Sequence, residues 1–211
     1  MSAFVRHPVF ARLQTWMTSR ESPKIVEHRR ELLRRLSGRV LEVGAGGGAN
    51  FAYYPQTVTE VLAVEPEPYM REKATAAAAR ASVPVTVVDS TAEHLPAADE
   101  SIDAAVACLV LCSVPDQARA LGELRRVLRP RGELRFYEHV LSHKPAVAAS
   151  QRFVDTTFWP RAFGGCHTAR DTPAAIQAAG FEIEELQRMW VPPVAVAVPV
   201  ATHALGWARR V

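Results

Sequence analysis

Short apolar runs alternate with charge-rich stretches along the chain from residue 39 onward. The apolar runs predict strands, because they are short and alternate with stretches of helical pattern. They lie at 39–43, 60–65, 83–88, 102–111 and 132–140, with two closing strands at 181–190 and 201–210. The stretches between them predict helices at 47–53, 67–81, 116–128, 146–158 and 172–179. Strands that alternate with helices pair in parallel, so we expect an α/β fold with a doubly wound, mainly parallel seven-stranded sheet.

The first 37 residues follow a different pattern. Apolar side chains recur at helical spacing between charged ones, from Phe10 to Leu36. Ser22 and Pro23 interrupt this pattern, which predicts two helices joined by a turn. We therefore expect a helical cap over residues 1–37 and a single domain over 38–211.

Charge is distributed unevenly between these two parts. Residues 1–39 carry nine basic side chains against three Glu, whereas the remainder carries 16 against 19 acidic ones. A nucleic-acid-binding domain spreads its basic face over the whole fold, so we expect no nucleic-acid partner. The uncharged stretch at 189–208 is interrupted by three prolines and a glycine, which disfavours a membrane span.

Two features of the composition bear on the origin of the protein. Only three lysines occur among 25 basic residues, and alanine is abundant, as in GC-rich bacterial genomes. Three cysteines are too few for a disulfide framework. We expect a bacterial, cytoplasmic protein.

The strongest local motif is the glycine-rich loop in RVLEVGAGGGAN, residues 39–50. An apolar strand runs directly into Gly44, Gly46 and Gly48, where glycine permits positive φ and close backbone approach to a ligand. Glu65 ends the next strand, 21 residues after Gly44. In nucleotide-binding α/β folds an acidic residue at this spacing accepts the ribose hydroxyls, so the pattern predicts a cofactor that contains adenosine.

Glu42 helps to choose between two such cofactors. It lies at the end of the first strand, two residues before the glycines, where its carboxylate would repel a pyrophosphate. The same carboxylate attracts an ammonium and a sulfonium. This favours S-adenosylmethionine over a nicotinamide dinucleotide.

Five motifs in order resemble the class I S-adenosylmethionine-dependent methyltransferases, which share a Rossmann-like fold. They are E-x-G-x-G-x-G at 42–48, Glu65, A-E-x-L-P at 92–96, S-I-D-A-A-V at 101–106 and R-V-L-R-P-x-G at 126–132. The resemblance implies that the methionine, ribose and adenine parts of the cofactor contact Glu42, Gly44, Ala45, Gly46, Gly48, Asn50, Glu65, Pro66, Met70, Thr91, Ala92, Glu93, Cys108 and Leu109. Thr91 stands where many members have Asp, and Arg131 stands at a turn position that is normally glycine.

Further segments resemble one branch, the methyltransferase-like proteins that include alkyl-thiol S-methyltransferases. They are GANF at 48–51, LVLCSV at 109–114, EHV at 138–140 and GCH at 165–167. The resemblance implies methyl transfer to a small hydrophobic acceptor, with a thiol as the favoured class. Mammalian members carry an apolar amino-terminal anchor, but residues 1–37 are charged here, so we expect no stable membrane span.

His139 and His167 are the candidate catalytic bases. His139 follows the fifth strand, at the end of the sheet where such folds hold substrates, and His167 lies on a loop that can cover this end. We interpret Cys108 and Cys112 as small core residues and expect no metal site. Aromatic and apolar side chains are expected to wall the acceptor pocket together with the 191–200 loop; they are Trp16, Met17, Tyr53, Phe153, Phe158, Trp159 and Phe163.

Other functions remain open at this point. The same fold can methylate a quinone-precursor carbon, a phenol or a phospholipid amine. A nicotinamide-dependent oxidoreductase also fits a glycine loop of this kind, and so does a protein that binds the cofactor without chemistry.

Overall fold

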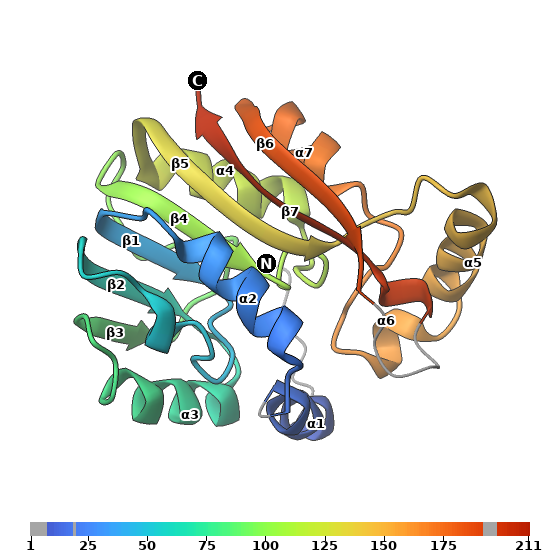
Figure 1. The fold of residues 1–211 in the computed structure, drawn as a ribbon, viewed down its shortest axis with the longest axis horizontal. Helices are drawn as coiled ribbons and strands as arrows, with labels where there is room; N and C mark the ends of the chain where they lie inside the picture. Colours follow the sequence, from blue (N-terminus) through green and yellow to red (C-terminus); the bar gives the residue numbers. More distant parts are fainter. Residues whose placement is uncertain (1–7, 19, 192–197) are drawn as a thin grey trace.

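The computed structural model describes residues 8–18, 20–191 and 198–211. Its centre is a seven-stranded sheet with strand order β3-β2-β1-β4-β5-β7-β6 (Figure 1). The strands are β1 Gly38–Val43, β2 Val58–Val64, β3 Val85–Val88, β4 Ile102–Cys108, β5 Leu128–His139, β6 Phe181–Trp190 and β7 Thr202–Arg210. All pairs are parallel except those of β7, which runs antiparallel to both neighbours. The α/β fold with a mainly parallel seven-stranded sheet is confirmed.

Helices cover both faces of the sheet, as parallel strands require. In Figure 1, α2 Pro23–Leu33 crosses in front of the sheet with α3 Pro68–Ala78 below it, whereas α4 Gln117–Val127 and α7 Thr172–Ala178 lie behind. One core packs α4 and α7 against the strands through residues such as Leu121 and Ile176. The other core buries Leu32 and Leu33 of α2 against the opposite face.

The two-helix prediction for the amino-terminal region is confirmed. α1 Pro8–Thr18 and α2 are separate, and the Ser22 hydroxyl accepts a hydrogen bond from the Ile25 N–H at the start of α2. In the part of the chain described here, no helix is long and apolar enough to cross a bilayer.

The helix predicted over 47–53 is wrong. Only a short 3₁₀ turn forms there, η1 Phe51–Tyr53, after a series of tight turns. Gly44, Gly46 and Gly48 all have positive φ, a conformation that interrupts a right-handed helix. The loop therefore offers turn amides to a ligand rather than the amino terminus of an α-helix.

The predicted strand at 102–111 ends earlier, at Cys108. Leu109 adopts a positive φ of 57°, which turns the chain out of the sheet. Arg131 has a φ of 64°, so this arginine takes the left-handed conformation that related proteins leave to glycine. The remaining helices, α5 Pro145–Thr156 and α6 Trp159–Ala162, and the 3₁₀ turn η2 Val198–Val200 lie beyond the carboxyl end of β5.

Candidate active site

The carboxyl ends of four parallel strands bring the candidate residues to one edge of the sheet. Val43, at the end of β1, pairs with Val64 of β2 and with Ala107 of β4, and Cys108 pairs with Tyr137 of β5. The glycine loop, Glu65, the 109–112 segment and His139 follow directly from these positions. Open α/β sheets bind their ligands at this edge.

The Glu65 carboxylate holds the glycine loop. One oxygen accepts the N–H of Gly46 at 2.7 Å and the other accepts the N–H of Glu67 at 2.9 Å. Burial raises the pKa of Glu65, and the two N–H donors oppose this rise. The acidic residue and the glycines therefore meet, as their sequence spacing predicts.

Gly46 and Gly44 differ in what surrounds them. A Cβ added at Gly46 would meet no other atom within 4 Å, whereas one at Gly44 would lie 2.3 Å from the Val110 side chain. Open space thus lies directly beside the loop amide that Glu65 orients. This open space, which we call the cradle, lies next to a buried carboxylate. It fits the ribose and methionine parts of S-adenosylmethionine.

Glu42 lies at the centre of a buried hydrogen-bond network. Its two oxygens accept from Asn50 Nδ2 at 2.8 Å and from the Tyr54 hydroxyl at 2.7 Å. The Arg29 guanidinium completes the group through a 2.8 Å hydrogen bond to Asn50 Oδ1. We call these four residues the carboxylate network. Burial raises the pKa of Glu42 to about 7, although the Tyr54 and Asn50 hydrogen bonds and the charge of Arg29 lower it.

Arg29 is a site residue that the sequence motifs do not indicate. It belongs to α2, yet only 6% of its surface is exposed, and it also donates to Cys108 Sγ at 3.1 Å and to Glu21. The sequence spacing does indicate its burial, because Ile25, Arg29 and Leu32 lie on one face of a helix. An arginine on the apolar face of a helix is buried together with its hydrogen-bond partners. Here its partners join α2 to Asn50 after the glycine loop and to Cys108 at the end of β4.

The residues implied for the adenine part lie after β2 and β3. Met70 and Ala92 are buried, Pro66 is partly buried, and Thr91 forms an isolated bridge with His94. The Glu93 carboxylate accepts the Asp116 N–H at 3.3 Å. At the end of β4, burial raises the pKa of Cys108 to about 11, which keeps this thiol protonated.

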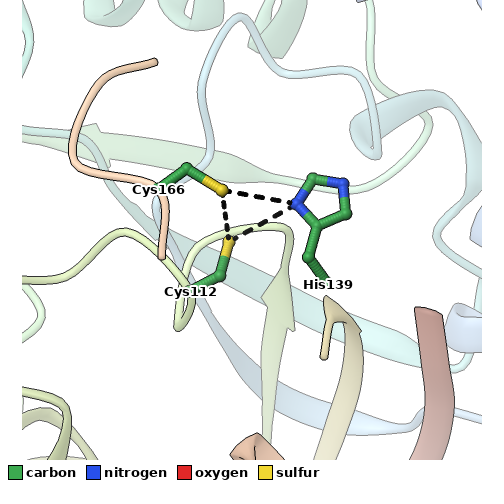
Figure 2. A group of neighbouring side chains, drawn as sticks. All are labelled: Cys112, His139 and Cys166. Atoms are coloured by element: carbon green, nitrogen blue, oxygen red, sulfur yellow. Dashed lines mark hydrogen bonds between the residues drawn. The ribbon is translucent and has the colours of Figure 1, made fainter. Parts of the chain in front are cut away.

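A second group of functional side chains gathers beyond β4 and β5. Figure 2 shows Cys112, His139 and Cys166 pointing toward one another from three different segments. His139 Nδ1 lies 3.7 Å from Cys112 Sγ and 3.6 Å from Cys166 Sγ, and the two sulfurs are 3.9 Å apart. We call these three residues the sulfur–histidine cluster. The Cys112 thiol and the His139 imidazole hold the pKa of Cys166 well below its usual value, although burial opposes them.

His167 has a different partner. Its Nδ1 lies 3.0 Å from the Asp155 carboxylate, which also accepts the Thr168 N–H. The backbone N–H of His167 donates to the Cys112 carbonyl at 2.8 Å, so this loop lies against the segment after β4. An imidazole oriented by a carboxylate has the geometry of a general base.

The predicted pocket residues divide into two groups. Trp159 and Phe163 stack with ring centroids 4.0 Å apart and pack against Cys112 and Cys166. Tyr53 is partly buried beside Arg30. The other predicted wall residues are exposed; they are Trp16, Met17, Phe153 and Phe158. Residues 192–197 of the expected wall lie outside the described part of the chain, so acceptor contacts remain a prediction.

Known proteins agree with this architecture. The sequence profile of the Methyltransferase domain family matches residues 41–136. A thiol S-methyltransferase of Mus musculus, TMT1B, is 36% identical over 212 residues, which cover 95% of this chain and 86% of the relative. TMT1A of Homo sapiens, also a thiol S-methyltransferase, is 34% identical over 180 residues, covering 80% of this chain and 73% of the relative.

Solved structures give the same fold. An S-adenosylmethionine-dependent methyltransferase of Mesorhizobium loti superposes with a TM-score of 0.65 at 22% identity, covering 87% of this chain and 96% of that one. Geranyl diphosphate methyltransferase, solved in complex with its cofactor, superposes with a TM-score of 0.66 at 13% identity, covering 89% and 85%. At these identities the likeness concerns the fold alone, but the identity to TMT1B spans nearly the whole chain. The chain therefore belongs to the S-adenosylmethionine-dependent methyltransferase family of TMT1B and TMT1A.

Proposed function

We propose that the protein methylates the sulfur of a small hydrophobic thiol. The observation that carries the proposal is the 36% identity, across 95% of the chain, to a relative named for thiol S-methylation. The surroundings of the sulfur–histidine cluster also suit such an acceptor, because Trp159 and Phe163 give them an apolar wall. The nicotinamide alternative is set aside by membership of the methyltransferase family.

The carboxylate network and the glycine loop are assigned to the cofactor. S-adenosylmethionine supplies the methyl group on a sulfonium centre. Glu65 would accept the ribose hydroxyls, and Glu42 would attract the ammonium and sulfonium. The other predicted cofactor residues keep the roles that the family resemblance gives them.

His167 is the better-supported general base of the two predicted histidines. Asp155 orients its ring, whereas His139 Nδ1 faces two sulfurs and has no carboxylate at hydrogen-bond distance among the described residues. A base of this kind takes the proton of the acceptor thiol as its sulfur becomes nucleophilic. His139 is proposed to position that sulfur.

Two further assignments belong to the same proposal. Residues 1–37 form a helical cap that closes over the methyltransferase domain of residues 38–211, and Arg29 supports this, because it joins α2 to Asn50 and Cys108. The composition and the three free cysteines support a bacterial cytoplasmic location.

An acceptor panel tests the proposal. The purified protein is incubated with S-adenosylmethionine carrying a labelled methyl group and with alkyl thiols, phenols, amines and a quinone precursor. We expect label to enter thioethers, with higher kcat/KM for more apolar thiols. Transfer to carbon, oxygen or nitrogen alone overturns the thiol assignment. Cofactor binding without turnover of any acceptor favours a protein that binds without chemistry.

A further inference from the structure

The sulfur–histidine cluster is held in place by groups that are not part of it. Glu138, fully buried, accepts the N–H groups of Val110, Leu111 and Cys112 and thereby fixes the segment that carries Cys112. Gln151, also fully buried, donates to the carbonyls of Val140 and Thr168. These two buried side chains therefore fix the segments that carry Cys112, His139 and Cys166. Such support is typical of ligand-binding positions.

The spacing of the three donor atoms matches a metal centre. Zinc binds thiolate sulfur at about 2.3 Å and imidazole nitrogen at about 2.0–2.1 Å in a tetrahedron, which sets sulfur–sulfur edges at about 3.8 Å and sulfur–nitrogen edges at about 3.6 Å. The cluster has edges of 3.9, 3.7 and 3.6 Å between its Sγ and Nδ1 atoms. One cation can therefore contact all three donors without a change in their separation.

The donor set indicates which cation fits and how. Two thiolates and one imidazole are soft or borderline ligands, which select zinc over magnesium or calcium. In the described part of the chain, the ligand atoms of Cys112, His139 and Cys166 all lie within 4.8 Å of one another. Zinc with three protein ligands keeps its fourth position for an exogenous ligand, as catalytic zinc sites do.

We propose that Cys112, His139 and Cys166 bind one zinc ion whose fourth position takes the sulfur of the acceptor. The second half of this statement rests on the proposed thiol methylation, whereas the first half does not. Cys112 and Cys166 are buried and His139 is partly exposed, so the cluster opens on its histidine side. The stacked Trp159 and Phe163 cover the sulfur side with apolar surface.

Ligation changes the acceptor without any redox step. The S–H bond of the acceptor breaks, a sulfur–zinc bond forms with the sulfur electron pair, and the proton passes to the His167 imidazole. Cys112 and Cys166 release their thiol protons to solvent when the cation binds, and the two resulting thiolates balance its charge. The acceptor then enters as a third thiolate. A thiophilic metal would thereby select thiols over phenols and amines of similar shape.

Metal content and cobalt spectroscopy test the first half. The full-length protein, purified with reductant and zinc, should retain about one zinc per chain after gel filtration. Its cobalt-substituted form should show thiolate-to-cobalt charge transfer and the intense visible bands of tetrahedral cobalt. Cys112→Ser, Cys166→Ser and His139→Gln should each lose most of the bound metal. Cys108→Ser, which alters the third free cysteine, should retain it.

Binding of S-adenosylhomocysteine serves as the folding check for the Cys112, Cys166 and His139 variants, since the cluster shares no residue with the carboxylate network. Circular dichroism serves as the folding check for Cys108→Ser, because Cys108 is a predicted cofactor contact. A wild-type protein that folds but retains no zinc and shows no cobalt–thiolate band overturns the metal site. So does mass spectrometry that finds Cys112 and Cys166 in a disulfide in protein purified under reductant.

The fourth position is tested separately on the cobalt form. A small alkyl thiol should shift the visible bands, whereas the matching alcohol should leave them unchanged. If the bands do not respond to thiols, the open position is refuted even when metal is bound. If thiols shift the bands but the labelled-methyl assay finds no thioether, the metal site stands and the proposed methylation fails.

Discussion

The carboxylate network and the sulfur–histidine cluster lie at the same edge of the sheet, yet they are built from opposite chemistry. In the first, Glu42 receives hydrogen bonds on both oxygens and Arg29 lies beside it, so charged and polar groups are buried with matched partners. In the second, two thiols and an imidazole face one another within an apolar surround. Hydrogen-bonded charge suits a zwitterionic cofactor, and soft donors suit a thiol.

This contrast predicts that substitutions in the two regions affect different measured quantities. Variants of the glycine loop, Glu65 and Glu42 should change cofactor affinity, whereas variants near Cys112 and Cys166 should change acceptor turnover at unchanged cofactor affinity. A variant of either region that alters both quantities equally contradicts the division.

His167→Ala is expected to have the largest effect. Loss of the base should lower kcat at neutral pH by about 10²–10⁴-fold. The deficit should shrink as pH rises toward the pKa of the acceptor thiol, near 8.5 for a free thiol and lower for one bound to a metal. Steady-state rates from pH 6.5 to 9.5 measure this, with His143→Ala, an exposed histidine, as the control. A deficit that is constant with pH refutes the base assignment.

Gly46→Val tests the cofactor side. Gly46 has a φ of 55° and open space at its Cβ position, so valine strains the backbone and occupies the proposed cradle. We expect S-adenosylhomocysteine affinity to fall by more than about 100-fold, since each 1.4 kcal/mol lost is tenfold. Gly122→Val, which also has open space at Cβ but lies in α4, is the matched control. Normal calorimetric binding by the folded Gly46→Val protein contradicts the placement of the cofactor.

Glu65→Gln should have a smaller effect on the same quantity. The amide replaces one acceptor oxygen by a donor, so it cannot accept from both Gly46 and Glu67. Loss of one charge-assisted hydrogen bond costs about 1.5–3 kcal/mol, which is roughly 10- to 150-fold in affinity. Glu72→Gln removes one negative charge from the exposed side of α3 and should leave affinity unchanged. An unaltered affinity in Glu65→Gln would show that the ribose binds elsewhere.

The two regions also differ in how far the sequence predicts them. The glycine loop and Glu65 follow from local motifs, because each ends a strand whose neighbour is fixed by parallel pairing. The absence of a helix over 47–53 follows from the positive φ of the alternating glycines Gly44, Gly46 and Gly48, which the apolar pattern does not report. The sequence pattern did not single out Arg29, although its spacing from Leu32 and Leu33 places it on the buried face of α2.

The sulfur–histidine cluster is not readable from spacing. Cys112 and Cys166 are each 27 residues from His139, far outside the short intervals of local metal motifs. Glu138 and Gln151 bring the three segments together, and the contacts of these two side chains depend on the completed sheet. The sequence therefore predicts His139 as a site residue but indicates only a small core residue at Cys112.

The last prediction concerns the pH dependence of the carboxylate network. Burial gives Glu42 a folded-state pKa of about 7, above its unfolded value of 4.5, so the folded protein binds the extra proton between these values. The contribution of Glu42 to stability is therefore fully present below pH 4.5 and is lost as pH rises through about 7, with a slope of at most about 1.4 kcal/mol per pH unit. Glu42→Gln cannot ionise, so its free energy of unfolding relative to wild type should rise from pH 5 to 8. Urea denaturation at four pH values measures this difference, and parallel profiles would mean that Glu42 remains ionised throughout. Because a bound cation favours the ionised carboxylate, wild-type affinity for S-adenosylmethionine should also increase through pH 7, and that of Glu42→Gln should not.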